Sequence, residues 1–441
     1  MAFALSSILW TPLRLRLRPR RGGAVSGRDG RRAVAPLAVA LGAGLVWLLS
    51  GNAAATIKPR QEPSADDLLF PKPPVVRRQV RFWEQVFGRY PSTTVIVHDS
   101  NDLDRIIDLI DYKIFASRAD RDQPVPRKQR DDVTLKYLKR YTRAAERFAK
   151  EGDRARRYGA IEERLFSVYK DDPAALKKLY DGDIKIRAQT GLADDFLHAA
   201  ATAQAYLPYM ERVFAQYGIP IILSRLPFVE SMFNVRARSK VGASGLWQFM
   251  PQTARNYVYV NSMVDERNSP FKATRAAAQF LQGNFKDLEA WPLAITAYNH
   301  GKMGMAHAAR QLGTRDIGTI IENYDSNSFG FASRNFYAEF LAAANTYDAL
   351  LRANRIDRKV NLPESESILL KAPLSIDTLL KNTPLTRALL AEHNPCLLES
   401  TLTRNSAKPL PAYYELKVPR ALAQATKAAL EALKTRIYAR R

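Results

Sequence analysis

Residues 226–234 read LPFVESMFN, and this stretch is the most informative part of the chain. Its one carboxylate, Glu230, has large apolar side chains on both sides. A carboxyl group held among apolar side chains loses the solvation of its charged form, so its pKa rises and it can act as a general acid near neutral pH. Ser231, the next residue, is placed to donate a hydrogen bond to the carboxylate or to a substrate. Taken alone, the pattern also fits an ordinary glutamate that faces solvent at the end of an apolar run.

A second informative stretch follows at residues 241–248, which read VGASGLWQ. Two glycines and other small residues allow close backbone approach, as a groove for an extended polymer requires. Two interpretations remain open for Trp247 and Gln248. They are either a core aromatic residue with a surface amide, or a stacking plane with a hydrogen-bonding group that contacts a substrate.

A third stretch, WPLAITAYNHG, occupies residues 291–301. Tyr298 and Asn299 have side chains that can hydrogen-bond a sugar acetamido group. Each also has an ordinary structural interpretation, as a core tyrosine and as a polar cap at a helix end.

The three stretches in this order resemble the catalytic domain of soluble-type (SLT) lytic transglycosylases, which cleave the glycan strand of peptidoglycan. The Glu-Ser pair, the GLWQ block and Ala-Tyr-Asn are similar to that family's three motifs. Trp247 resembles the membrane-bound lytic murein transglycosylase D branch, as does the stretch RNFY at residues 334–337. His300 departs from the small residue that is usual before the glycine, and we place it on the rim of the groove.

The resemblance implies a mechanism with a single acid and base, Glu230. In the family one glutamate protonates the glycosidic oxygen between MurNAc and GlcNAc and then accepts the proton of the muramoyl C6 hydroxyl, leaving a 1,6-anhydromuramoyl end. An intramolecular nucleophile of this kind needs no second carboxylate to activate water. The resemblance also implies that Ser231 orients Glu230 or the substrate and that Gln248 contacts the substrate. It further implies that Tyr298 and Asn299 orient the acetamido group and that Tyr337 hydrogen-bonds Glu230.

Two other functions stay open. A goose-type-lysozyme-like muramidase would hydrolyse the same bond with water, and a non-catalytic peptidoglycan-binding protein would keep the fold without the reaction. A nucleic-acid-binding protein rests on charge alone, and the signs of export described below argue against it, so we expect no nucleic acid partner.

The hydrophobic pattern is helical over most of the chain, so we expect a mainly α protein. It is expected to contain a lysozyme-like catalytic domain, a helical N-terminal domain and a small α+β segment, similar to a degenerate LysM module, at the C-terminus. Residues 103–114 show helix spacing, and residues 93–97 form a short β-type run that we expect to pair with little else. The predicted parts are a signal segment (1–55), a proline-rich linker (56–74), the helical N-terminal domain (75–190), the catalytic domain (191–355) and the C-terminal segment ending in a basic helix (356–441).

The N-terminus has the order of charges expected of an export signal. Eight arginines and one aspartate lie within residues 1–55, and the uncharged, mostly apolar residues 33–49 are followed by small residues. We therefore expect export to the periplasm or cell envelope of a Gram-negative bacterium, with signal cleavage near Ala55 or attachment to the inner membrane through residues 33–49. The formal net charge is +23, of which +16 lies beyond residue 55, and this suits glycan strands that carry carboxylates.

The composition argues against metal chemistry and a disulfide framework. The chain has one cysteine and five histidines, without an HExxH sequence or paired Cys and His spacing. We therefore expect no metal and no cofactor.

Overall fold

The computed structural model describes residues 68–115, 126–356 and 360–438. Helices predominate in these ranges, and the predicted mainly α fold class is confirmed. The predicted signal segment and nearly all of the predicted linker lie outside the described residues, so the structure does not address them. Among the described helices, none has both the length and the apolar character needed to cross a membrane.

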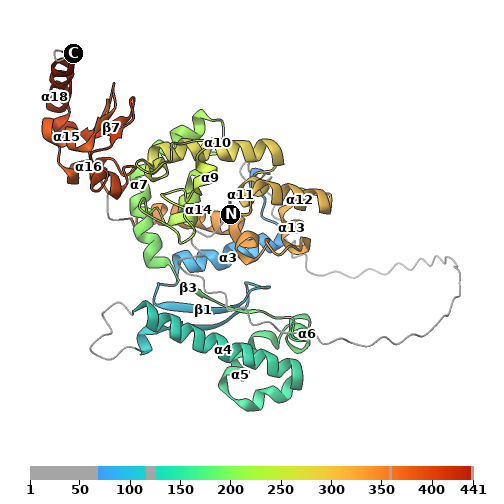
Figure 1. The fold of residues 1–441 in the computed structure, drawn as a ribbon. Coiled ribbons are helices and arrows are strands. Elements are labelled where there is room, and N and C mark those ends of the chain that lie inside the picture. Colours follow the sequence, from blue (N-terminus) through green and yellow to red (C-terminus); the bar gives the residue numbers. More distant parts are fainter. Residues whose placement is uncertain (1–67, 116–125, 357–359, 439–441) are drawn as a thin grey trace, which may run out of the picture. The chain divides into compact units, whose positions relative to one another are not determined.

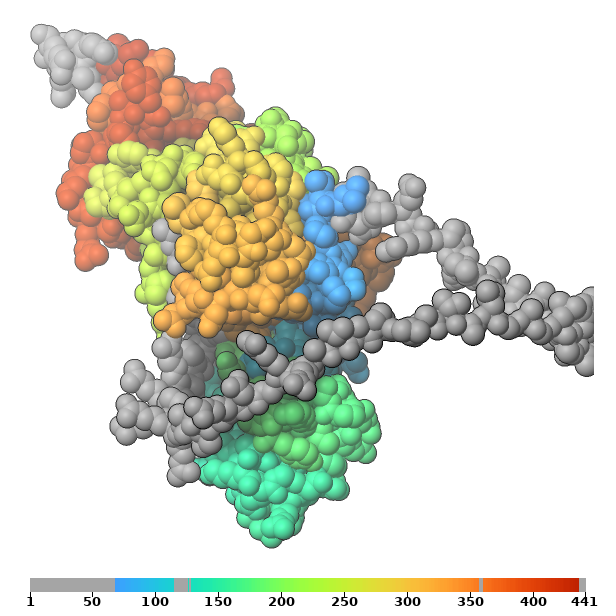
Figure 2. Space-filling model, turned by 90° about the vertical axis from the view of Figure 1, so that its right-hand side faces the viewer, coloured from blue at the N-terminus to red at the C-terminus, as the bar shows by residue number. Residues whose placement is uncertain are grey.

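The largest hydrophobic core belongs to a group of helices drawn from two distant parts of the sequence. One N-terminal helix, α3, packs along the long helix α14 (Figure 1), and the Trp83 indole donates a hydrogen bond of 3.1 Å to Asn335 between them. Figure 2 shows the surface of α12 and α13 beside that of α3. The helices are α3 (Pro74–Gly88), α7 (Ala193–Gln216), α8 (Leu226–Ser231), α9 (Pro251–Ala254), α10 (Pro270–Leu288), α11 (Trp291–His300), α12 (Lys302–Leu312), α13 (Ile317–Asn323) and α14 (Phe331–Arg352).

Helix α11 is buried over Trp291–Asn299, because that stretch carries no charged side chain and can be covered on every side. Pro292 stands in its first turn, where a missing backbone N–H costs no hydrogen bond. The helix ends before Gly301, whose φ of 92° other residues rarely adopt. This ending places Tyr298 and Asn299 on the last turn of a central helix.

A three-stranded antiparallel sheet lies between α3 and α4 (Figure 1). Strand β1 is central, and its residues alternate between two cores because successive side chains point to opposite faces. Ile96 belongs to the core of the large helical group, whereas Val95 and Val97 belong to a second core with α4, α5 and α6. The elements are β1 (Thr94–Asp99), β2 (Ile106–Asp111), β3 (Ile186–Thr190), α4 (Arg127–Glu151), α5 (Ala160–Tyr169) and α6 (Pro173–Asp181).

Two predictions about this region are wrong. The stretch 103–114, predicted to be helical, contains strand β2, and the run 93–97 pairs with two strands instead of with little else. The apolar residues Ile106, Ile107 and Ile110 fit helical spacing, but β-branched side chains also favour a strand, and the sheet supplies the hydrogen bonds. The predicted helical N-terminal domain therefore contains a sheet as well as helices.

The C-terminal residues form a small third core of strands and helices. β4 pairs antiparallel with β7, and the elements β5, α15, α16, α17 and β6 lie between them in sequence. The LysM-like character of this segment stays a prediction. The elements are β4 (Ser365–Leu369), β5 (Leu374–Ser375), α15 (Ile376–Asn382), α16 (Arg387–His393), α17 (Glu399–Leu402), β6 (Pro409–Leu410), β7 (Glu415–Pro419) and α18 (Arg420–Tyr438).

Candidate active site

Helix α8 is short, and all six of its residues are buried. Pro227 stands in the first turn, and the helix ends because Met232 and Phe233 both adopt left-handed backbone angles, with φ of 49° and 52°. Such angles cost a side-chain-bearing residue about 1 kcal/mol each, so the surrounding packing must hold them. The tight turn follows Glu230 and Ser231 directly and fixes where these two residues lie.

Glu230 is 6% exposed, so the surface interpretation of this glutamate is wrong and the expectation of an apolar environment is confirmed. Burial, with a smaller contribution from the charge of Glu339, raises the pKa of Glu230 to about 8. Among the residues that the structure describes, no group hydrogen-bonds or ion-pairs with this carboxyl. A carboxyl with this pKa is largely protonated at neutral pH, as a general acid must be.

Ser231 holds the backbone of a neighbouring segment and does not donate to the carboxylate. Its hydroxyl donates to the Leu246 carbonyl at 2.8 Å, with a longer contact of 3.3 Å to the Pro227 carbonyl. The hydroxyl proton is therefore used within the fold. Ser231 ties α8 to the GLWQ block and so fixes the position of Glu230 indirectly.

Trp247 and Gln248 both serve the packing of their own loop. Trp247 is fully buried, and its indole N–H donates to the Thr274 hydroxyl at 3.0 Å, so the core interpretation is confirmed and the stacking plane is wrong. The Gln248 side-chain N–H group donates to the carbonyls of Ala237 at 3.1 Å and Gly245 at 2.8 Å. A substrate contact by Gln248 remains a prediction, and its amide hydrogens are occupied by the loop.

Tyr298 and Asn299 connect α11 to the GLWQ loop and to α14. The Tyr298 hydroxyl donates to the Trp247 carbonyl at 2.8 Å, and burial, with a second contribution from the nearby Glu230, raises the pKa of Tyr298 well above its ordinary value. Asn299 accepts a hydrogen bond of 2.9 Å from Ser333 on α14. The three motif segments therefore meet around Glu230, as their resemblance to a known site implies.

Tyr337 is placed differently from the prediction. Its hydroxyl donates to the Pro71 carbonyl at 3.0 Å, and burial raises its pKa. A hydroxyl has one proton to donate, so the expected donation to Glu230 is absent from this structure. The residue on α14 whose charge raises the pKa of Glu230 is Glu339, two positions further along the helix.

Sequence reasoning also missed a buried ion pair that supports the GLWQ loop. Arg267 makes paired hydrogen bonds to the Asp265 carboxylate, at 2.8 and 2.7 Å, and donates to the carbonyls of Gly242 and Phe249 at 2.7 and 2.8 Å. One nitrogen of the guanidinium thus holds the loop that contains Gln248, while the other two are held by Asp265. Its sequence context, Asp265-Glu266-Arg267, looks like an ordinary charged surface turn and gave no signal.

The structure offers no metal site near these residues. Within the described ranges, no three His, Cys, Asp or Glu side chains gather closely enough to hold a metal ion.

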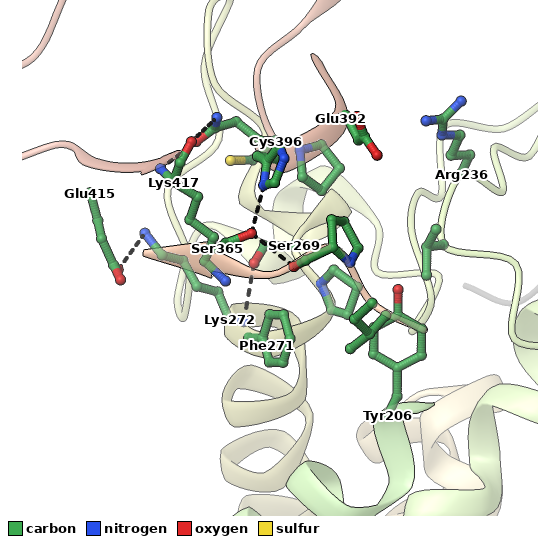
Figure 3. A pocket seen from close by; sticks show the side chains of 17 residues that line it. Tyr206, Arg236, Ser269, Phe271, Lys272, Ser365, Glu392, Cys396, Glu415 and Lys417 are labelled. Atoms are coloured by element: carbon green, nitrogen blue, oxygen red, sulfur yellow. Dashed lines mark hydrogen bonds and ion pairs between the residues drawn. The ribbon is translucent and has the colours of Figure 1, made fainter. Parts of the chain in front are cut away.

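A separate pocket lies between the start of α10 and the C-terminal segment (Figure 3). Its lining includes Phe271 and Lys417, whose ammonium nitrogen lies 4.0 Å from the centre of the Phe271 ring. Ser365 and His393, also in the lining, share a hydrogen bond of 2.7 Å. None of the candidate site residues lines this pocket, so it is distinct from the surroundings of Glu230.

Residues 215–321 match the model of the family named Transglycosylase SLT domain. This stretch is therefore similar to an SLT domain over about a quarter of the chain. This match covers α8, the GLWQ loop and α11, the three segments that meet around Glu230.

Curated relatives match over a similar length. A protein named for tributyltin chloride resistance, from Alteromonas sp. (strain M-1), is 36% identical over 105 residues, which are 23% of this chain and 51% of the relative. Membrane-bound lytic murein transglycosylase D of Escherichia coli (strain K12) is 33% identical over 110 residues, 24% of this chain and 24% of the relative. The chain thus spans about half, or less, of the length of these relatives.

Among solved structures, the 70 kDa soluble lytic transglycosylase of Escherichia coli aligns with 48% of this chain and 31% of its own. The sequence identity is 18% and the TM-score is 0.29.

A glycine substitution tests the packing of the GLWQ loop. Gly245 has a φ of 75°, and a Cβ atom there would lie 2.0 Å from the Arg267 carbonyl oxygen. We expect Gly245→Ala to lower the free energy of unfolding by about 3 kcal/mol, since backbone strain and a backbone clash add. Gly242→Ala is the matched control, because its φ is 93° but a Cβ would meet nothing within 4 Å. Urea unfolding measures both, and equal losses would show that the close approach at Gly245 is not a constraint.

The burial of Glu230 predicts a pH-dependent stability. Its pKa is about 8 in the folded protein against 4.5 for a free side chain, so the folded state binds more protons between these values. The contribution of Glu230 to stability is then fully present below about pH 4.5 and is lost as the pH rises to about 8, by at most about 5 kcal/mol for this shift. Glu230→Gln should unfold at a higher temperature than the wild type at pH 8.5 and at the same temperature near pH 4. An unchanged difference between the two across this range would mean that Glu230 ionises normally.

Proposed function

We propose that this protein is a peptidoglycan lytic transglycosylase that cleaves the MurNAc-β-1,4-GlcNAc bond with Glu230 as its acid and base. The observation that carries the proposal is the position of Glu230. It is a buried carboxyl, protonated near neutral pH, at the point where the three segments of the SLT domain meet. The match of residues 215–321 to the SLT family supports the substrate class.

The reaction begins with proton donation. Glu230 gives its proton to the glycosidic oxygen, and the bond from that oxygen to C1 of the muramoyl residue breaks. The C6 hydroxyl oxygen of the same residue bonds to C1, and its proton returns to Glu230, so no water is consumed. A carboxyl whose pKa lies near the working pH serves both halves of this cycle, because it is neither too weak an acid nor too weak a base.

The neighbouring residues prepare the site for this step. Ser231 and Tyr298 donate to backbone carbonyls of the GLWQ loop and keep Glu230 in place. Asn299 accepts from Ser333 through its oxygen, and its amide N–H groups have no acceptor among the described residues. These N–H groups are candidates for the carbonyl of the substrate acetamido group, and Gln248 remains a candidate contact at the groove.

The location and partner follow from charge. Beyond residue 55 the chain carries +16, which favours a substrate rich in carboxylates such as peptidoglycan with its lactyl and peptide groups. We propose that the protein works in the cell envelope, with residues 1–55 as the export signal or anchor.

A hydrolytic muramidase is a second candidate, because the structure adds a second buried carboxyl, Glu339, to the surroundings of Glu230. Hydrolysis needs an ionised carboxylate to activate water or to attack C1. Burial raises the pKa of Glu339 to about 8, which leaves it largely protonated at neutral pH and therefore a poor base. This observation favours the transglycosylase.

Product analysis tests the proposal directly. Digestion of purified peptidoglycan should give muramoyl ends that are lighter by one water than reducing ends, as read by mass spectrometry. Glu230→Gln should lower the rate at least about a hundredfold, since general acid catalysis contributes this much or more. The folded state of the variant is checked by circular dichroism.

The outcomes separate the candidates. Reducing ends alone would establish the muramidase, and full activity of the Gln variant would show that Glu230 is not the acid. Binding to peptidoglycan without any cleavage by the wild-type chain would establish a binding protein.

A further inference from the structure

Glu339 is a buried acidic residue that the sequence motifs do not explain. It lies on α14, between the buried residues Ala338 and Phe340, and is 9% exposed. Within the described part of the chain, no residue hydrogen-bonds or ion-pairs with its carboxyl. A buried carboxyl without a partner costs free energy, and such groups gather at functional sites.

Helix α14 is in contact with two segments of the candidate site. The rings of Phe228 on α8 and Tyr347 on α14 have centroids 5.2 Å apart. Ser333, nearer the start of α14, donates to Asn299 on α11. Glu339 lies between Ser333 and Tyr347 along this helix, so it is flanked by the two residues of α14 that contact α11 and α8.

The other charged groups around α8 do not neutralise this pair. Arg225, just before α8, donates to Glu211 and lies beside the Tyr347 ring. Tyr298 on α11 donates to a backbone carbonyl. The charge that shifts the pKa of Glu230 is that of Glu339, and the charge that shifts the pKa of Tyr298 is that of Glu230. No cation contributes to either shift.

We propose that Glu339 is a positioning residue for the catalytic proton: two buried carboxyl groups without a countercharge cannot both ionise, so one proton stays with the pair and is available on Glu230. This inference rests on the proposed function of Glu230. It goes further by assigning the retention of the proton to a named second residue.

The arrangement suits a cycle in which the same carboxyl donates and then recovers a proton. As the pH approaches about 8, the pKa of Glu339, its growing negative charge makes the Glu230 carboxylate a stronger base, which favours return of the proton from the C6 hydroxyl. A pair that shares one proton titrates as a unit, so the pH dependence of the reaction belongs to both residues.

The pH profile of glycan cleavage tests the proposal with the full-length protein. Burial, together with the charge of Glu339, raises the pKa of Glu230 to about 8, so the wild-type rate should fall as the pH rises through this value. Removing the negative charge with Glu339→Gln lowers the pKa of Glu230, and the falling limb should move about one unit lower in pH. We expect kcat at pH 8 to fall about fivefold while KM changes less than about twofold, since Glu339 acts through Glu230.

Two variants serve as controls. Glu322→Gln removes an exposed carboxylate on α13, 3.9 Å from Arg78, and should leave the profile unchanged because solvent screens its charge. Glu339→Asp keeps the charge with a shorter side chain and should keep the falling limb close to its wild-type position. If Asp moves the limb as far as Gln does, or if Gln does not move it, the proposal is overturned.

A second measurement does not depend on activity. In the Glu230→Gln background Glu339 is left as the single carboxyl of the pair, and its pKa, raised by burial to about 8, predicts that stability still declines with rising pH. The double variant with Glu339→Gln should lose this decline in thermal unfolding. Should the wild type cleave no glycan, the proposed function fails. The unfolding data still decide whether the pKa of the Glu339 carboxyl is raised. A decline that persists in the double variant would overturn that part.

Discussion

The burial of one carboxyl group, Glu230, among apolar side chains is the constraint on which the rest of the structure depends. Every residue of α8 is buried, and the turn that ends it places two successive residues in left-handed conformations. No cation compensates the carboxyl within the described residues, and the charge that acts on it, that of Glu339, has the same sign. The packing of the helices therefore maintains an acid in its protonated form, at a cost that the fold must offset elsewhere.

The polar residues of the motifs help to hold Glu230 in place by hydrogen-bonding the backbone around it. Ser231, Gln248 and Tyr298 all donate to main-chain carbonyls, and they join α8, the GLWQ loop and α11 into one unit. Arg267, which forms a buried ion pair with Asp265, supports the same loop. A reactive side chain is held accurately when its neighbours are themselves fixed by packing and hydrogen bonds. These motif residues thus serve the geometry of the site, and their roles toward a substrate are proposals.

The sequence was sufficient where the deciding information is local. The apolar neighbours of Glu230 predict its burial. The role of Tyr337 was predicted wrongly and Glu339 was missed, and the two lie two residues apart on one long helix. Which of them faces α8 depends on how that helix is rotated against its neighbours, and the sequence around them does not encode this.

The prediction of the sheet failed for a related reason. Residues 106–111 carry isoleucines at spacings that fit both a helix and a strand, and pairing with β1 decides between them. The sheet is completed by β3 on the other side of β1, about eighty residues further along the chain, so a local pattern cannot report it. The mainly α class was nevertheless predictable, because long amphipathic segments with helical spacing make up most of the chain.

The protonation state of Glu230 in the folded protein tests the central claim most directly. In protein labelled with ¹³C at the glutamate carboxyl carbons, the resonance that disappears in Glu230→Gln belongs to this residue, and its shift can be followed with pH. The account predicts a titration midpoint near 8, the value to which burial and Glu339 raise its pKa. A midpoint near 4.5, the ordinary value for glutamate, would contradict it.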